Sequence, residues 1–130
     1  MHQVHIGNES EFVKITIRKL RRTADWIGGD AEVTVRGFSA SISADFEPTD
    51  FQNFETEMSA LYESLSGEAK LRPIGEQLTL LLRGNGRGQI VVTGTAWSVA
   101  CYGSKLDFEF EIDQTFLPGI LKQLSAINVL

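Results

Sequence analysis

The segment from Leu106 to Leu130 constrains the fold more than any other part of the sequence. Apolar and acidic residues alternate strictly as far as Asp113, which is the pattern of a strand with one buried and one solvated face. Leucine and isoleucine then recur at helical spacing as far as Ile127, and Thr115 is a predicted N-cap. The segment therefore predicts a strand followed by a helix that folds back on the strand's apolar face.

Alternation elsewhere predicts further strands, and one more stretch has helical spacing from Phe51 to Leu65, with Thr49 as its predicted N-cap and Gln52 completing a capping box. The glycines between residues 84 and 88 predict a hairpin turn. The fold class that follows is α+β: an antiparallel sheet of about six to seven strands with two helices packed on one face, in the order βββα-β-βββα, forming one domain over residues 1–130. The remaining strands are predicted at Val4–Ile6 (a weak edge), Glu11–Arg18, Ala31–Arg36, Phe38–Phe46, Glu68–Pro73, Leu78–Leu82 and Ile90–Trp97.

Composition narrows the classes of function. The net charge of −5 and pI near 5.0 argue against a protein that binds nucleic acid directly by neutralising phosphates. The single Cys101 excludes an intramolecular disulfide and favours a reducing compartment. No apolar run reaches the roughly 20 residues that a membrane span needs, and the N-terminus lacks the features of a signal peptide. These observations predict a cytoplasmic protein with no membrane partner.

The sequence contains no convincing catalytic or metal-binding motif. His2 and His5 lie three residues apart, so on a strand they would point to opposite faces and would make a poor metal pair. Cys101 has no second cysteine or nearby histidine to activate it. We therefore expect no cofactor, no metal and no enzymatic activity. The alternative is an enzyme whose site forms only on folding, for example around His5 and a carboxylate.

The most unusual polar feature is an acidic ladder, defined as Asp107, Glu109, Glu111 and Asp113. Successive side chains on one face of a strand stand about 6.5–7 Å apart, so the carboxylates repel one another only mildly. Two interpretations stay open. The ladder is a solvated sheet face paired across strands with cations, or it is a negative patch for a basic partner. The candidate cations are Lys14, Arg18, Arg36 and Arg83.

Residues Thr23 to Asp30 are predicted to form a loop that carries one large aromatic side chain. Asp25 and Trp26 are candidate partner-binding residues, because aromatic side chains dominate the energetics of protein interfaces. The alternative is that Trp26 folds over a sheet edge, since tryptophan is highly buried on average.

Three stretches resemble small bacterial WapI-like immunity proteins. They are LRGNGRGQIVVTGTA (Leu82–Ala96), FEFEIDQTFLP (Phe108–Pro118) and YESLSGEA (Tyr62–Ala69). The resemblance implies a non-catalytic protein that binds and neutralises a contact-delivered toxin, typically a nuclease acting on tRNA. The partner would then be a basic nuclease toxin domain, and the chain would be a monomer or a weak homo-oligomer. The alternative class is a structural or oligomerising domain that associates through its open sheet face or an edge strand.

Overall fold

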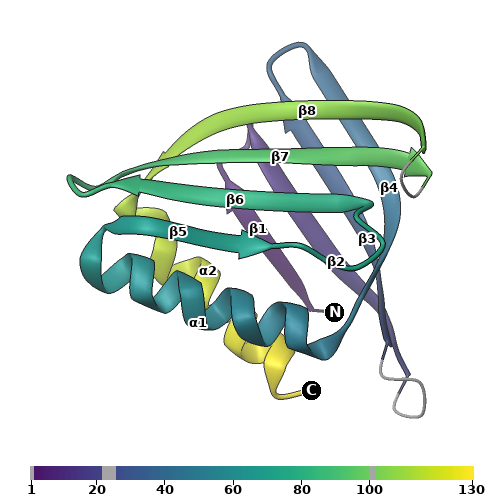
Figure 1. Ribbon diagram of the computed structural model, residues 1–130, viewed down its shortest axis with the longest axis horizontal. Coiled ribbons are helices and arrows are strands. Elements are labelled where there is room, and N and C mark those ends of the chain that lie inside the picture. Colours follow the sequence, from purple (N-terminus) through teal and green to yellow (C-terminus); the bar gives the residue numbers. More distant parts are fainter. Residues whose placement is uncertain (1, 22–25, 100–101) are drawn as a thin grey trace.

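The chain contains two copies of one unit, four strands followed by a helix (Figure 1). The computed structural model describes residues 2–21, 26–99 and 102–130. The strands of each unit pair in chain order into one four-stranded antiparallel sheet. The first unit comprises β1 (Gln3–Gly7), β2 (Phe12–Arg21), β3 (Trp26–Val35), β4 (Phe38–Phe46) and α1 (Pro48–Ser64). The second comprises β5 (Ser66–Leu71), β6 (Leu78–Asn85), β7 (Gln89–Val99), β8 (Tyr102–Asp113), the 3-10 helix η1 (Gln114–Phe116) and α2 (Leu117–Asn128).

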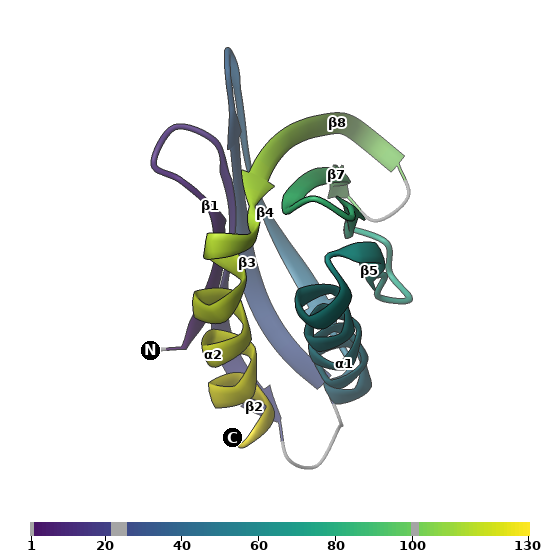
Figure 2. The same ribbon diagram turned by 90° about the vertical axis from the view of Figure 1, so that its left-hand side faces the viewer.

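The predicted α+β class and antiparallel pairing are confirmed, but the prediction of one sheet is wrong. The described residues form eight strands in two sheets, where six to seven strands in one sheet were expected. Figure 2 shows the two sheets as separate layers, with α1 beneath β5 and α2 alongside β1. Alternation reveals that a strand buries one face, but it does not say whether a helix or a second sheet covers that face. The helices are therefore not both packed on one face of a single sheet.

Strand β3 includes Trp26 to Asp30, a stretch that was predicted to be a loop. Two consecutive glycines at positions 28 and 29 are typical of loops, and this pattern caused the error. In the structure a Cβ at Gly29 would lie only 3.1 Å from the Thr16 carbonyl oxygen, beside an irregularity in the pairing of β2 with β3. Glycine suits this position because two backbones approach closely within the sheet.

One apolar core lies between the sheets and the helices. The rings of Phe46, at the end of β4, and Phe51, in the first turns of α1, have their centroids 4.9 Å apart, and both side chains are fully buried. The periodicity of α1, β8 and α2 predicts that six large apolar residues share this core, and all of them are buried except Leu121, which is partly buried. The buried members are Phe51, Phe54, Phe108, Phe110 and Leu124.

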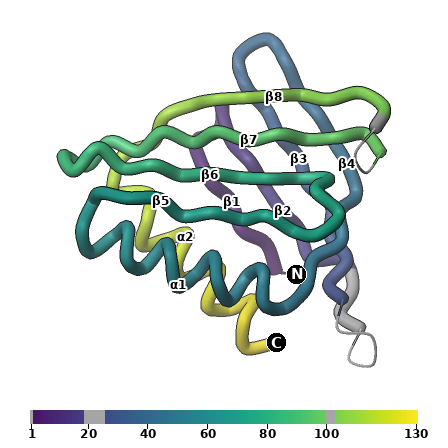
Figure 3. Tube along the Cα trace, viewed as in Figure 1, coloured from purple at the N-terminus to yellow at the C-terminus, as the bar shows by residue number. Residues whose placement is uncertain are grey.

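Each helix closes one sheet edge. The Glu57 carboxylate of α1 accepts a hydrogen bond of 2.8 Å from the Lys70 N–H of β5. The Gln123 side chain of α2 accepts one of the same length from the His5 N–H of β1. The two helices run next to each other along the bottom of the trace in Figure 3. They are joined by a hydrogen bond of 3.1 Å, which the Asn128 side-chain amide donates to the Phe51 carbonyl. The edge strands without a covering helix are therefore β4 and β8.

The hairpin predicted between residues 84 and 88 is confirmed, but both predicted helix caps are wrong. Helix α1 begins at Pro48, and the Asp50 carboxylate accepts a hydrogen bond of 2.7 Å from the Glu47 N–H, so the helix starts before the predicted cap. At the second helix Asp113 caps η1, by accepting from the Thr115 N–H at 2.8 Å. In both places a carboxylate acts at the helix start, where it also interacts favourably with the helix dipole.

Candidate protein-binding surface

The acidic ladder lies on β8, at one edge of the second sheet. Its four carboxylates are exposed, because the intervening Phe108, Phe110 and Ile112 point into the core. The neighbouring strand β7 places only uncharged residues opposite the ladder, so the acidic face is not neutralised by that strand. In register order these neighbours are Thr95, Thr93, Val91 and Gln89.

The two ends of the ladder are held by hydrogen bonds. The Thr95 hydroxyl donates to the Asp107 carboxylate at 2.7 Å, and Lys105 Nζ lies 3.4 Å from the same group. The hydrogen bond from Thr95, assisted by Lys105, places the pKa of Asp107 below its ordinary value. At the other end the hydroxyl and N–H of Thr115 both donate to Asp113 and lower its pKa in the same way. Both groups therefore stay charged into acidic solution.

The middle of the ladder has no partner within the described part of the chain. The carboxylates of Glu109 and Glu111 are exposed and make no ion pair or side-chain hydrogen bond with any described residue. Two uncompensated negative charges thus face solvent on an edge strand.

The predicted pairing of the ladder with cations of other strands is wrong. None of the four candidate cations reaches the ladder, and three of them bind carboxylates elsewhere. These pairs are Lys14–Glu32 at 3.3 Å, Arg18–Asp30 at 3.3 Å and Arg83–Glu68 at 3.4 Å. The first two lie across β2 and β3 of the other sheet. Lys14 and Arg18 were assigned wrongly because the sequence does not reveal that the strands divide between two sheets, whereas Arg83 shares the sheet of the ladder but pairs with Glu68 of β5.

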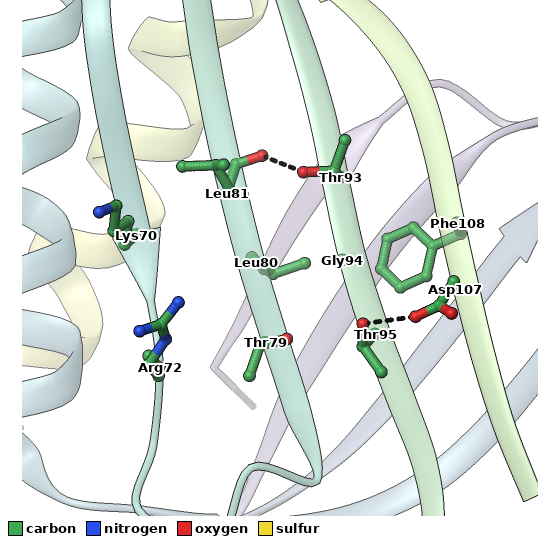
Figure 4. A pocket seen from close by; sticks show the side chains of 10 residues that line it. All are labelled: Lys70, Arg72, Thr79, Leu80, Leu81, Thr93, Gly94, Thr95, Asp107 and Phe108. Atoms are coloured by element: carbon green, nitrogen blue, oxygen red, sulfur yellow. Dashed lines mark hydrogen bonds between the residues drawn. The ribbon is translucent and has the colours of Figure 1, made fainter.

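A hollow of about 320 Å³, open on one side, crosses the outer face of the second sheet next to the ladder. Figure 4 shows Lys70 and Arg72 on one side of it and Asp107 on the other. Short polar side chains, including Thr79 and Thr95, lie between them. The sequence analysis missed the basic side of this face. The sequence did contain a signal for it. Lys70 and Arg72 flank the buried Leu71, so alternation turns both cations to the outer face.

The other two predicted partner-binding residues do not join this face. Trp26 begins β3 on the first sheet and is 41% exposed. That end of β3 lies at the bottom of Figure 1, whereas β8 crosses the top, so the two sites are separate. Trp26 is a strand residue rather than part of a loop beside the ladder. Asp25 lies outside the described residues.

The described residues contain no group of three or more side chains suited to holding a metal ion. His5 stacks on Phe12 with ring centroids 4.9 Å apart, and partial burial together with Lys14 lowers its pKa. Cys101 lies outside the described residues. In the part of the chain that the structure describes, neither helix has the length and apolar character to cross a membrane.

The comparison with protein families shows to which family the chain belongs. The model of the immunity protein WapI-like family matches residues 4–128, which include both sheets and both helices. The chain belongs to the WapI-like immunity protein family. The resemblance inferred from the sequence is thereby confirmed, and an immunity role follows from the family. The outer face of the second sheet is then a candidate toxin-binding surface of a WapI-like protein.

A solved structure described as Trypanosoma bruciei MRP1/MRP2 has a similar fold, with a TM-score of 0.52. The alignment covers 95% of this chain and 80% of that chain at 10% sequence identity. At this level of identity the likeness concerns the arrangement of strands and helices only. No curated protein matches the sequence.

Proposed function

We propose that this WapI-like protein neutralises a contact-delivered toxin of the tRNA-nuclease type in the cytoplasm, by covering the toxin's basic active face. The observation that carries the proposal is the pair of exposed, unpaired carboxylates of Glu109 and Glu111 on an acidic protein of net charge −5. A nuclease must attract a polyanion, so its active face is basic. An acidic sheet edge can occupy such a face by presenting the same sign of charge as the RNA.

Electrostatics favours the ladder over the exposed face of the first sheet. On the first sheet, Lys14 and Glu32 form an ion pair across neighbouring strands, and so do Arg18 and Asp30, so these four charges compensate one another locally. Charges that are compensated locally contribute little to long-range attraction. The uncompensated carboxylates of β8 can steer a basic partner, and steering of this kind raises association rates by about 10- to 1,000-fold.

The test first seeks the toxin domain in the neighbouring gene, and then measures its association rate with a Glu109→Lys, Glu111→Lys variant. We expect association to slow by about tenfold or more at low salt. The difference should shrink between about 0.1 M and 1 M salt, over which the Debye length falls from about 10 Å to about 3 Å. The control is Glu9→Lys, Glu63→Lys, which changes the net charge equally at two exposed residues outside the ladder.

A folded ladder variant with an unchanged rate and unchanged salt dependence would exclude this face as the binding surface. The nuclease part is tested separately, by adding an equimolar amount of the protein to the toxin and tRNA. Inhibition of cleavage by the wild type is the expected result. A toxin that leaves tRNA intact in the absence of this protein would refute that part.

A further inference from the structure

The outer face of the second sheet carries charges of both signs: Lys70 and Arg72 lie at its β5 side and the ladder lies on β8, while Glu68 and Arg83 pair with each other in a neighbouring row. The pairing register places Lys70, Leu81, Thr93 and Glu109 in one row across β5, β6, β7 and β8. The next row contains Thr79, Thr95 and Asp107, and Arg72, which follows β5, stands at its open end in Figure 4. Each of these two rows therefore runs from a cation, across two uncharged residues, to a carboxylate.

The two sets of charges are too far apart to neutralise each other. Neighbouring strands are about 4.8 Å apart, so the β5 and β8 ends of a row are separated by roughly 14 Å. This separation exceeds the Debye length of about 8 Å at physiological salt. The cations are also only weakly engaged on their own side. Lys70 Nζ lies 4.0 Å from Glu68, and Arg72 forms no ion pair with any residue that the structure describes.

The shape of the face allows a partner to reach the cations. The hollow lies between the basic and acidic sides, and its middle is formed by threonine side chains and Leu81. These short side chains leave the longer Lys70 and Arg72 as one wall, while Asp107 stands on the opposite side. An open, shallow site of this kind fits a protruding side chain of a protein better than it encloses a small molecule.

We propose that the toxin contacts this face with two signs of charge, placing basic residues over Glu109 and Glu111 and at least one carboxylate in the hollow beside Lys70 and Arg72. This inference rests on the proposed function and adds the polarity of the partner. A uniformly basic toxin face that covered the whole sheet would bring its cations against Lys70 and Arg72, and like charges in an interface oppose binding. A partner that carries both basic and acidic residues avoids this repulsion. Only one orientation on the sheet then pairs its basic residues with the ladder and its carboxylate with Lys70 and Arg72.

The experiment measures association rates with the same toxin domain for Lys70→Glu, Arg72→Glu, for the ladder variant, and for all four substitutions combined. The two-sign contact predicts that Lys70→Glu, Arg72→Glu associates about tenfold more slowly than the wild type at low salt, although the protein has become more acidic. A uniformly basic toxin face predicts the opposite sign, a faster rate. The matched control is Arg36→Glu, Lys122→Glu, which makes the protein equally acidic away from this face and should not slow association.

The fourfold variant keeps the net charge of the wild type and reverses the polarity of the face. The proposal predicts that it is the slowest of the set, whereas a wild-type rate would show that net charge alone governs association. If a charge-reversal variant does not fold, Lys70→Gln, Arg72→Gln serves instead and is expected to slow association to a smaller degree. Failure of the wild type to bind the toxin would refute the proposed function itself. Normal wild-type binding, a slow ladder variant and an unslowed Lys70, Arg72 variant would overturn only this inference.

Discussion

Replacing Gly94 with alanine should destabilise the protein strongly, although nothing in its backbone conformation demands glycine. Gly94 lies on β7 between Leu80 of β6 and Phe108 of β8. A Cβ at this position would collide with the Phe108 ring and would lie 2.5 Å from the Thr79 carbonyl oxygen. The ring can swing aside only by leaving the core, and the carbonyl belongs to the backbone of the adjacent strand.

The expected cost follows from these two contacts. Overpacking a close-packed core typically costs about 1–3 kcal/mol, and we expect the upper end because one of the two obstacles is backbone. A loss of about 3 kcal/mol with an m-value near 2 kcal/mol/M lowers the urea midpoint by about 1.5 M. The assay is equilibrium urea unfolding followed by far-UV circular dichroism, with the m-value checked for two-state behaviour.

The matched control is Gly119→Ala. Gly119 lies in α2, and an added Cβ there would have no atom within 4 Å. The same chemical change should stabilise this helix by up to about 1 kcal/mol, because glycine is a poor helix former. A Phe108→Leu change should also relieve part of the Gly94→Ala cost, as a double-mutant cycle would show. A Gly94→Ala protein within about 0.5 kcal/mol of the wild type, an ordinary result for an uncrowded site, would refute the steric argument.

Two titration experiments test the electrostatics. Thr95→Val removes the hydroxyl that donates to Asp107, so the pKa of Asp107 should rise toward its ordinary value in a carboxyl NMR titration, and an unchanged pKa would assign the depression to Lys105 instead. Burial lowers the pKa of His5, so the unfolded chain binds the proton more readily than the folded one. The contribution of His5 to the free energy of unfolding should therefore be fully present above about pH 6.5 and should be lost as the pH falls below it. His5→Gln should flatten this dependence between pH 7.5 and 5.5, and equal slopes would show that His5 is not its source.

The strands were predictable because each buries one face and alternates accordingly. The ends of Phe38–Phe46 match the prediction, and the helix stripe from Phe51 to Leu61 packs into the core as its spacing indicates. The division into two sheets was not predictable, because period-2 alternation carries no information about which surface covers the apolar face. Two glycines in β3 also concealed the first half of that strand, since glycine serves both loops and close backbone approaches.

The ladder was predictable as an exposed acidic face, but the positions of the cations around it were not. Lys14 and Arg18 looked like natural partners for it, yet both lie on the other sheet with carboxylates of their own. The sequence did not single out Lys70 and Arg72 as site residues, because β5 is short. Only the register of four strands shows where these cations lie relative to the ladder. Local pattern therefore locates charges on faces, whereas their mutual distances depend on topology.

The contact between α2 and β1 bears on when the protein becomes active during its synthesis. The bond from the His5 N–H to Gln123 joins residues 118 positions apart, so the edge at β1 stays open until α2 has been translated. Contacts between such distant residues form slowly, and a bare edge strand can pair with other chains in the meantime. On the proposed function, a chain that still lacks α2 would thus give no protection against an incoming toxin. We expect a cell to depend on molecules that were completed earlier, and hence on a standing stock rather than on synthesis after attack.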